Sequence, residues 1–306
     1  MKQISLGGTS WMVPAVAVGC MRLGELDSAA LGRFIHAALD HGANFFDHAD
    51  IYGGGACEEH FGAALQSDPS LRREDLILQS KCGIRKGLYD SSKEHILAAA
   101  DGILKRLRTD YLDILLIHRP DALVEPEEVA AAFDELERKG KVRHFGVSNH
   151  APMQIELLKK AVRQPLLIDQ LQFSIPVSNM VAGGLEVNME TPGSVNRDGS
   201  VLDYARLHDI TIQAWSPFQS PNWSGCFLGD ARYPELNQEL NVLGERYDAS
   251  ATAIAAAWIL RHPARMQLIT GTAKESRLLE ILRASDIQLT REEWYRLYLA
   301  AGHPLP

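Results

Sequence analysis

Short apolar runs alternate with longer amphipathic runs along most of the chain. The short runs are rich in β-branched residues and Leu, which is typical of buried strands, and the longer runs begin near Ser, Asp or Pro. The predicted strands are 15–19, 43–49, 75–81, 111–118, 141–148, 166–173, 210–216 and 266–271. The predicted helices are 28–42, 57–67, 92–109, 126–140, 152–162, 200–209, 234–247, 250–262, 274–284 and 290–301. We expect Ser28 to cap the first helix and Gly42 to follow its end.

Eight strand-like runs separated by helices predict parallel pairing through right-handed crossovers. This pattern favours a (β/α)8 TIM barrel, which fits residues 1–306 as a single domain. QISLGGTSWMV near the start predicts an N-terminal β-hairpin turning at Gly7–Gly8, and the last two helical runs are extra C-terminal helices. The alternative is an open Rossmann-type sheet. It is weakened because the glycines of AVAVGCMRLGELD do not follow the G-x-G-x-x-G spacing.

Two segments, 174–199 and 218–234, interrupt the alternation and are rich in Gly, Pro and Asn. Each follows a predicted strand, so in a barrel each would lie at the C-terminal face, where ligands bind. Trp223 and Phe227 in the second segment are candidates for the wall of a substrate pocket. The alternative is a surface loop that packs only on itself.

Four groups with acid–base chemistry fall at one predicted rim. Asp47, Lys81 and His118 stand at the ends of successive strands, and Tyr52 follows Asp47 into a glycine turn. A buried carboxylate and a buried ammonium are each costly alone, so we expect Asp47 and Lys81 to pair. A cation beside the Tyr52 oxygen is expected to lower the pKa of the phenol toward neutral, which suits a general acid.

Composition limits the remaining classes of function. The net charge of −8 argues against a nucleic acid or an anionic membrane as partner. Four cysteines without a C-x-x-C pair make neither a disulfide framework nor a zinc ribbon, and no metal-ligand motif is present. The start of the chain lacks a secretory signal, so we expect a soluble cytoplasmic protein. Cys82 is interpreted as packing, whereas Cys57, near a helix start where a thiolate is favoured, keeps a redox role open.

Several motifs together resemble the aldo-keto reductase superfamily. They are FFDHADIYG at 45–53, LQSKCG around Lys81, LLIH ending at His118, GVSNH at 146–150 and QLQFS at 170–174. They occur in order, and the resemblance extends from the hairpin to about residue 280. The GCMRLGE opening and the TREEWYRLYLAAGHPLP tail resemble the bacterial oxidoreductases of the YdhF type.

The resemblance implies reduction of aldehyde or ketone carbonyls by NADPH, with NADH as the alternative cofactor and no metal. Tyr52 would be the general acid, Lys81 and Asp47 would tune it, and His118 would orient the carbonyl. The implied cofactor contacts are Ser148, Asn149 and Gln170 for the carboxamide, Trp215 for the nicotinamide ring, and Ser216, Pro217, Phe218, Gly271, Thr272, Lys274, Arg277 and Glu280 for the remainder.

The sequence also departs from common patterns of the superfamily. Trp215 replaces a frequent Tyr, Gly271 replaces a frequent Lys, and Ile281 replaces a frequent Asn. The alternative function is a cofactor-binding regulatory or partner-binding protein with little turnover, as for the potassium-channel β subunits of the superfamily. The natural carbonyl substrate and the oligomeric state do not follow from the residues.

Overall fold

Eight parallel strands close into a barrel in the computed structural model, which describes residues 1–305. In spatial order the strands are β10, β11, β12, β3, β4, β5, β8 and β9. Their bounds are β3 (Val16–Gly19), β4 (Phe45–Asp47), β5 (Ile77–Cys82), β8 (Leu112–Ile117), β9 (Val142–Ser148), β10 (Leu166–Gln172), β11 (Thr211–Trp215) and β12 (Gln267–Thr270). The predicted (β/α)8 barrel is confirmed.

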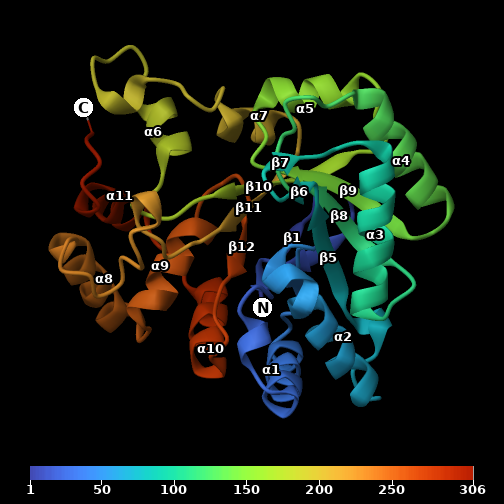
Figure 1. The fold of residues 1–306 in the computed structure, drawn as a ribbon. Helices are drawn as coiled ribbons and strands as arrows, with labels where there is room; N and C mark the ends of the chain where they lie inside the picture. Colours follow the sequence, from blue (N-terminus) through green and yellow to red (C-terminus); the bar gives the residue numbers. More distant parts are fainter. Residues whose placement is uncertain (306) are drawn as a thin grey trace.

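Helices surround this barrel and bury the apolar outer faces of its strands (Figure 1). They are α1 (Ser28–Asp40), α2 (Ala56–Ser67), α3 (Lys93–Leu107), α4 (Pro126–Arg138), α5 (Pro152–Lys159), α7 (Val201–Leu207), α9 (Ala251–Leu260) and α10 (Glu275–Arg283). Helix α1 shows the predicted C-terminal pattern, since Gly42 follows its end with φ of 78°. The predicted cap is wrong: Asp27 caps α1 by accepting a hydrogen bond from the Ala30 N–H, and Ser28 is the first helical residue.

The N-terminal hairpin pairs β1 (Gln3–Ser5) with β2 (Met12–Pro14) and turns at Gly7–Gly8 as predicted. The Gly7 N–H donates to Thr211 Oγ1 at 2.8 Å, at the beginning of β11. Leu6 and Val13 are fully buried beneath the strands. The hairpin therefore closes the N-terminal end of the barrel and leaves the C-terminal end open for ligands.

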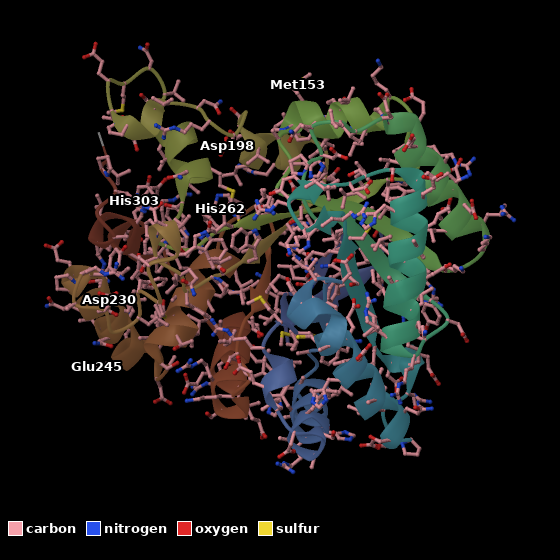
Figure 2. All side chains as sticks on the ribbon, in the orientation of Figure 1. Met153, Asp198, Asp230, Glu245, His262 and His303 are labelled. Atoms are coloured by element: carbon pink, nitrogen blue, oxygen red, sulfur yellow. The ribbon has the colours of Figure 1, made fainter. Side chains whose placement is uncertain are left out.

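The C-terminal helices pack beside α9. Helix α11 (Arg291–Ala300) contacts α8 (Pro234–Tyr247), and these lie together at the left of Figure 1. Trp258 of α9 and Trp294 of α11 stack with ring centroids 4.6 Å apart, and each indole N–H donates to the backbone carbonyl of the other residue. His303, labelled in Figure 2, binds the Ile175 carbonyl at 2.8 Å, so the tail anchors the segment after β10.

Two short elements were not predicted. The 174–199 segment contains helix α6 (Asn179–Leu185), whose Met180 and Val181 are buried. A small hairpin of β6 (Ile84–Arg85) and β7 (Leu88–Tyr89) follows β5. The 174–199 segment, predicted as a loop, therefore includes a short helix, because burial of Met180, Val181 and Ala182 stabilises it although it contains two glycines.

Candidate active site

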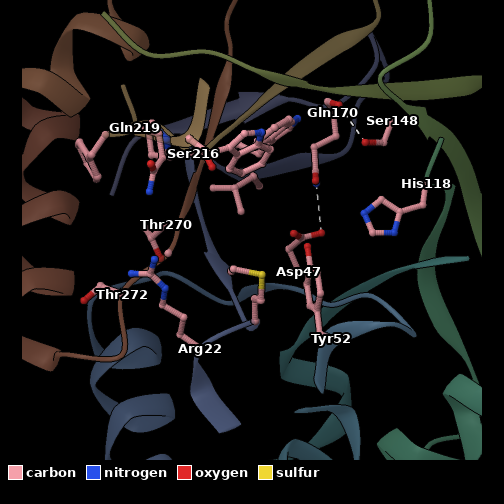
Figure 3. A pocket seen from close by; sticks show the side chains of 18 of the residues that line it. Arg22, Asp47, Tyr52, His118, Ser148, Gln170, Ser216, Gln219, Thr270 and Thr272 are labelled. Atoms are coloured by element: carbon pink, nitrogen blue, oxygen red, sulfur yellow. Dashed lines mark hydrogen bonds between the residues drawn. The ribbon is translucent and has the colours of Figure 1, made fainter. Parts of the chain in front are cut away.

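Side chains from β4, β5 and β8, which are neighbours in the barrel, come together at its open end. Figure 3 shows Asp47, Tyr52 and His118 there. Asp47 is the last residue of β4, Lys81 lies at the end of β5, and His118 directly follows β8. Parallel strands place their carboxyl ends on one rim, which explains how residues distant in sequence come together. Together with Tyr52, these are the four residues predicted to carry chemistry. Asp47, Tyr52 and His118 line one cavity, and the fully buried Lys81 lies behind them in contact with Asp47 and Tyr52.

Asp47 and Lys81 form a buried ion pair. Lys81 Nζ lies 2.8 Å from Asp47 Oδ1 and 2.9 Å from Oδ2, and it also donates to the His48 carbonyl at 2.6 Å. Burial by itself lowers the pKa of Lys81, but Asp47 and Tyr52 outweigh it and raise the pKa above 10.5. Lys81 therefore remains an ammonium, with each of its protons directed to an oxygen.

Tyr52 begins a 3-10 turn whose glycines adopt left-handed backbone angles, with φ of 59° at Gly53 and 65° at Gly54. These angles suit glycine and turn the chain so that the Tyr52 hydroxyl meets Lys81 Nζ at 3.2 Å. Burial raises the pKa of Tyr52 above 10.0, and Lys81 lowers it by less. The predicted net lowering of this pKa is wrong, because desolvation exceeds the attraction of an ammonium already paired with Asp47.

His118 faces Tyr52 edge-on, with ring centroids 6.2 Å apart. Burial is the main cause that lowers the pKa of His118 to about 2, and the positive charges of Lys81 and Arg119 lower it further. The imidazole is therefore neutral at physiological pH. Its Nδ1 is buried without a hydrogen-bond partner among residues 1–305. A neutral imidazole carries one N–H, which suits it to donate to an oxygen bound in the cavity.

A layer of glutamines below the rim supports Asp47 and was not predicted. Gln79 donates to Asp47 Oδ1 at 2.6 Å, and Gln170 donates to the same oxygen at 3.2 Å. Both also donate to Gln213 Oε1 at 2.8 Å, and Gln213 donates to Gln267. The sequence shows a glutamine in each of the predicted strands β5, β10, β11 and β12 but not that their side chains meet. These amides fix the orientation of the carboxylate that binds Lys81.

The rim continues through β9, β10 and β11. Ser148 Oγ donates to the Gln170 carbonyl at 3.0 Å, and Asn149 Nδ2 donates to Ser148 Oγ at 2.7 Å. Trp215 Nε1 donates to Asn149 Oδ1 at 3.2 Å, and the Trp215 ring stacks on Trp223 at 5.3 Å. Ser148, Asn149, Gln170 and Trp215 all line the same cavity as Tyr52.

This cavity has a volume of about 350 Å³ and extends from Tyr52 to the loop after β12. The other predicted cofactor residues that line it are Ser216, Pro217, Phe218, Gly271, Thr272 and Arg277. Lys274 and Glu280, which were predicted with them, do not line it: Lys274 is the N-cap residue of α10, and Glu280 lines a separate surface hollow. Arg22, Thr270 and Gln219 line the cavity and were missed; Arg22 follows the first barrel strand, as Tyr52 follows the second.

Residues 15–298 match the model of the aldo/keto reductase family. The chain belongs to the aldo/keto reductase family.

Several relatives agree with this assignment over nearly the whole chain. Oxidoreductase YdhF of Escherichia coli and the uncharacterized oxidoreductase YcsN of Bacillus subtilis are each 37% identical to it, and each match covers 94% of both proteins. The predicted likeness to YdhF-type oxidoreductases is confirmed. A crystal structure of a thermostable aldo-keto reductase in complex with epalrestat matches 98% of this chain and 100% of its own, with a TM-score of 0.78 and 27% identity.

The cavity of this aldo-keto reductase fits a nicotinamide dinucleotide. Thr270 Oγ1 is buried in its wall without a partner among residues 1–305, and a Cβ at Gly271 would meet no atom within 4 Å. Arg22, Thr272 and Arg277 add two guanidinium groups and a hydroxyl at the same end. Figure 3 shows Arg22 beside Thr270 and Thr272, across the cavity from His118. Cationic and hydroxyl donors beside open space suit phosphate groups.

Trp223 lines the cavity, but Phe227 is fully buried in the core and is not part of the substrate wall. Cys57 donates to the Met21 carbonyl at 3.3 Å, and burial raises its pKa above 9.0, so the expected thiolate is wrong. Cys82 is fully buried, as expected of a packing residue.

Residues 1–305 contain no group of three or more His, Cys, Asp or Glu side chains placed to hold a metal ion. Their helices are also all too short or too polar to cross a membrane.

Proposed function

We propose that this protein reduces aldehyde and ketone carbonyls to alcohols, with NADPH as cofactor and Tyr52 as the general acid. The observation that carries the proposal is the chain of contacts from Asp47 through Lys81 Nζ to the Tyr52 hydroxyl, at 2.8 Å and 3.2 Å. When bound, the cofactor supplies a hydride to the carbonyl carbon. The residues of the chain supply the proton and hold the substrate oxygen.

Tyr52 is suited to deliver that proton. Its raised pKa keeps the phenol protonated at neutral pH, so the acid form is ready to donate. Once the proton has moved to the substrate oxygen, the phenolate is left 3.2 Å from the Lys81 ammonium. Attraction at this distance in a buried site stabilises the charge as it develops, which lowers the barrier to proton transfer.

His118 and Asp47 position the reacting groups. The neutral His118 imidazole can donate a hydrogen bond to the same carbonyl oxygen without a competing cationic charge. Asp47 keeps Lys81 charged and directed toward Tyr52, and the glutamine layer holds Asp47. The carbonyl oxygen would therefore lie between the Tyr52 hydroxyl and the His118 ring.

Ser148, Asn149 and Gln170 would hold the carboxamide, since their side chains include amides that both donate and accept. Trp215 would pack against the nicotinamide ring with the larger indole in place of a phenol. Arg277 and Arg22, together with Thr270 and Thr272, would hold the phosphates, and two guanidinium groups favour NADPH over NADH.

Tyr52→Phe tests the proposal directly. We expect NADPH to bind this variant, detected by a change in cofactor fluorescence, while carbonyl-dependent NADPH oxidation falls by about 10²–10⁴-fold, the usual contribution of a general acid. The matched control is Tyr89→Phe, which removes a hydroxyl from an exposed position on β7 and should retain parental turnover.

Equal turnover by Tyr52→Phe and the parent would refute the assignment of the acid. Cofactor binding without oxidation of NADPH by any of a broad panel of carbonyls would instead favour the regulatory alternative.

A further inference from the structure

One guanidinium in the catalytic cavity has no role in the proposed reaction. Arg119 directly follows His118 and lines the same cavity as Tyr52. Its Cζ lies 6.0 Å from the centroid of the Trp215 ring, which also lines the cavity. This places the cation on the wall next to the residues that would hold the substrate oxygen.

The other charges of the cavity are already engaged or lie at its far end. Asp47 is paired with Lys81, and Arg22 lies beside Thr270 and Thr272, across the cavity from His118. None of the salt bridges of residues 1–305 includes Arg119. A protein of net charge −8 therefore keeps an uncompensated cation at the substrate end of this cavity.

The surroundings of Arg119 make an anionic partner favourable. The Trp215 ring lies 6.0 Å from the Arg119 Cζ and stacks on Trp223. Ile84 lines the same cavity, so a bound substrate would exclude water from the guanidinium. A cation that loses water without gaining a partner costs free energy, whereas a carboxylate or phosphate can accept two hydrogen bonds from the planar fork of an arginine. A substrate with a negative group would therefore bind better than a neutral one of the same shape.

We propose that Arg119 selects carbonyl substrates that carry a carboxylate or a phosphate group. This inference rests on the proposed carbonyl reductase function and specifies its substrate class. Arg119 would act as a specificity-determining residue that binds the anionic end of the substrate, while Tyr52 and His118 bind the carbonyl end.

A matched pair of substrates tests the proposal with the NADPH-loaded protein. The pair is 4-carboxybenzaldehyde and its methyl ester, which differ in charge but share an aromatic aldehyde. We expect kcat/KM for the acid to exceed that for the ester by about tenfold or more, the usual gain from hydrogen bonds between charged groups. Arg119→Met should abolish this preference, and Arg119→Lys should restore part of it because the charge returns without the fork.

Arg85→Gln is the control, because it removes the same charge from the neighbouring exposed β6 hairpin without altering the cavity wall. It should keep the parental ratio. Glyceraldehyde 3-phosphate and glyceraldehyde form a second pair, and a preference confined to one pair identifies whether carboxylate or phosphate is the recognised anion. A parent without preference in either pair, or an Arg119→Met variant with an unchanged ratio, would overturn the proposal.

A binding measurement distinguishes failure of the Arg119 proposal from failure of the proposed reductase function. Calorimetric titration of the cofactor-loaded protein with benzoate and with benzamide measures the charge preference without turnover. Tighter binding of benzoate that disappears in Arg119→Met would support the anion site even if neither aldehyde were reduced. Reduction of the ester that depends on Tyr52, with equal binding of benzoate and benzamide, would keep the reductase and refute the role of Arg119.

Discussion

Replacement of Lys81 by Met leaves Asp47 as a buried charge without its counterion. Lys81 is 0% exposed and Asp47 is 1% exposed, so water cannot replace the lost ammonium. At 2.8 Å the attraction amounts to about 6 kcal/mol with an effective dielectric constant of about 20. The amides of Gln79 and Gln170 still donate to Asp47, at 2.6 Å and 3.2 Å, and compensate in part. We therefore expect Lys81→Met to lower the free energy of unfolding by about 3–5 kcal/mol.

The assay is equilibrium unfolding in urea at pH 7, followed by tryptophan fluorescence. The double variant Asp47→Asn, Lys81→Met should regain more than about 2 kcal/mol relative to Lys81→Met, because no buried charge remains. Lys139→Met is the control: it breaks a 2.7 Å pair with Glu135 on the exposed face of α4 and should cost about 0.5 kcal/mol or less.

Two results would refute this reasoning. A loss below about 1 kcal/mol in Lys81→Met would mean that the glutamine amides alone stabilise the Asp47 carboxylate. A double variant no more stable than Lys81→Met would mean that the lost packing of the lysine stem, rather than the unpaired charge, causes the destabilisation.

Two further predictions concern packing and pH. Gly62→Ala should destabilise the protein by about 1–3 kcal/mol in urea unfolding, because the new Cβ would lie 2.3 Å from the Arg106 carbonyl oxygen. Gly32→Ala is the control: its Cβ would meet no atom within 4 Å, so it should stabilise α1 by about 0.5–1 kcal/mol. Burial raises the pKa of Asp169 from 3.8 to about 8, so its contribution to stability is complete below pH 4 and is lost as the pH rises through 8. Unfolding of Asp169→Asn should therefore depend less on pH between 4 and 9 than unfolding of the parent; equal dependence would refute the shift.

The convergence of Asp47, Lys81 and His118 was predictable because it depends only on local pattern. Each residue stands at or near the end of a predicted strand, and eight such strands in alternation with helices admit few topologies. The ends of consecutive parallel strands then share one rim. No long-range contact has to be known to bring these side chains together.

The pKa of Tyr52 was not predictable from the same pattern. The sequence shows that Lys81 can reach the phenol, but it does not show how much water the phenol loses on folding. Burial raises the pKa and Lys81 lowers it, and their balance depends on the packed cavity wall. The cap of α1 was missed for a related reason: Asp27 and Ser28 are both good caps, and only the backbone geometry chooses between them.

The glutamine layer shows where sequence periodicity alone falls short. Residues two apart on a strand share a face, so Gln79 and Lys81 of β5 both point into the barrel, and this could be read from the sequence. Gln213 could not be assigned to them, because its contact with Gln79 spans 134 residues and depends on how the strands are staggered around the closed barrel. This contact matters for the active site because Gln213 is hydrogen-bonded to Gln79, and Gln79 in turn donates a hydrogen bond to Asp47. The position of Asp47 at the rim follows from β4 alone. The orientation of its carboxylate, which keeps Lys81 directed at Tyr52, depends on closure of the barrel.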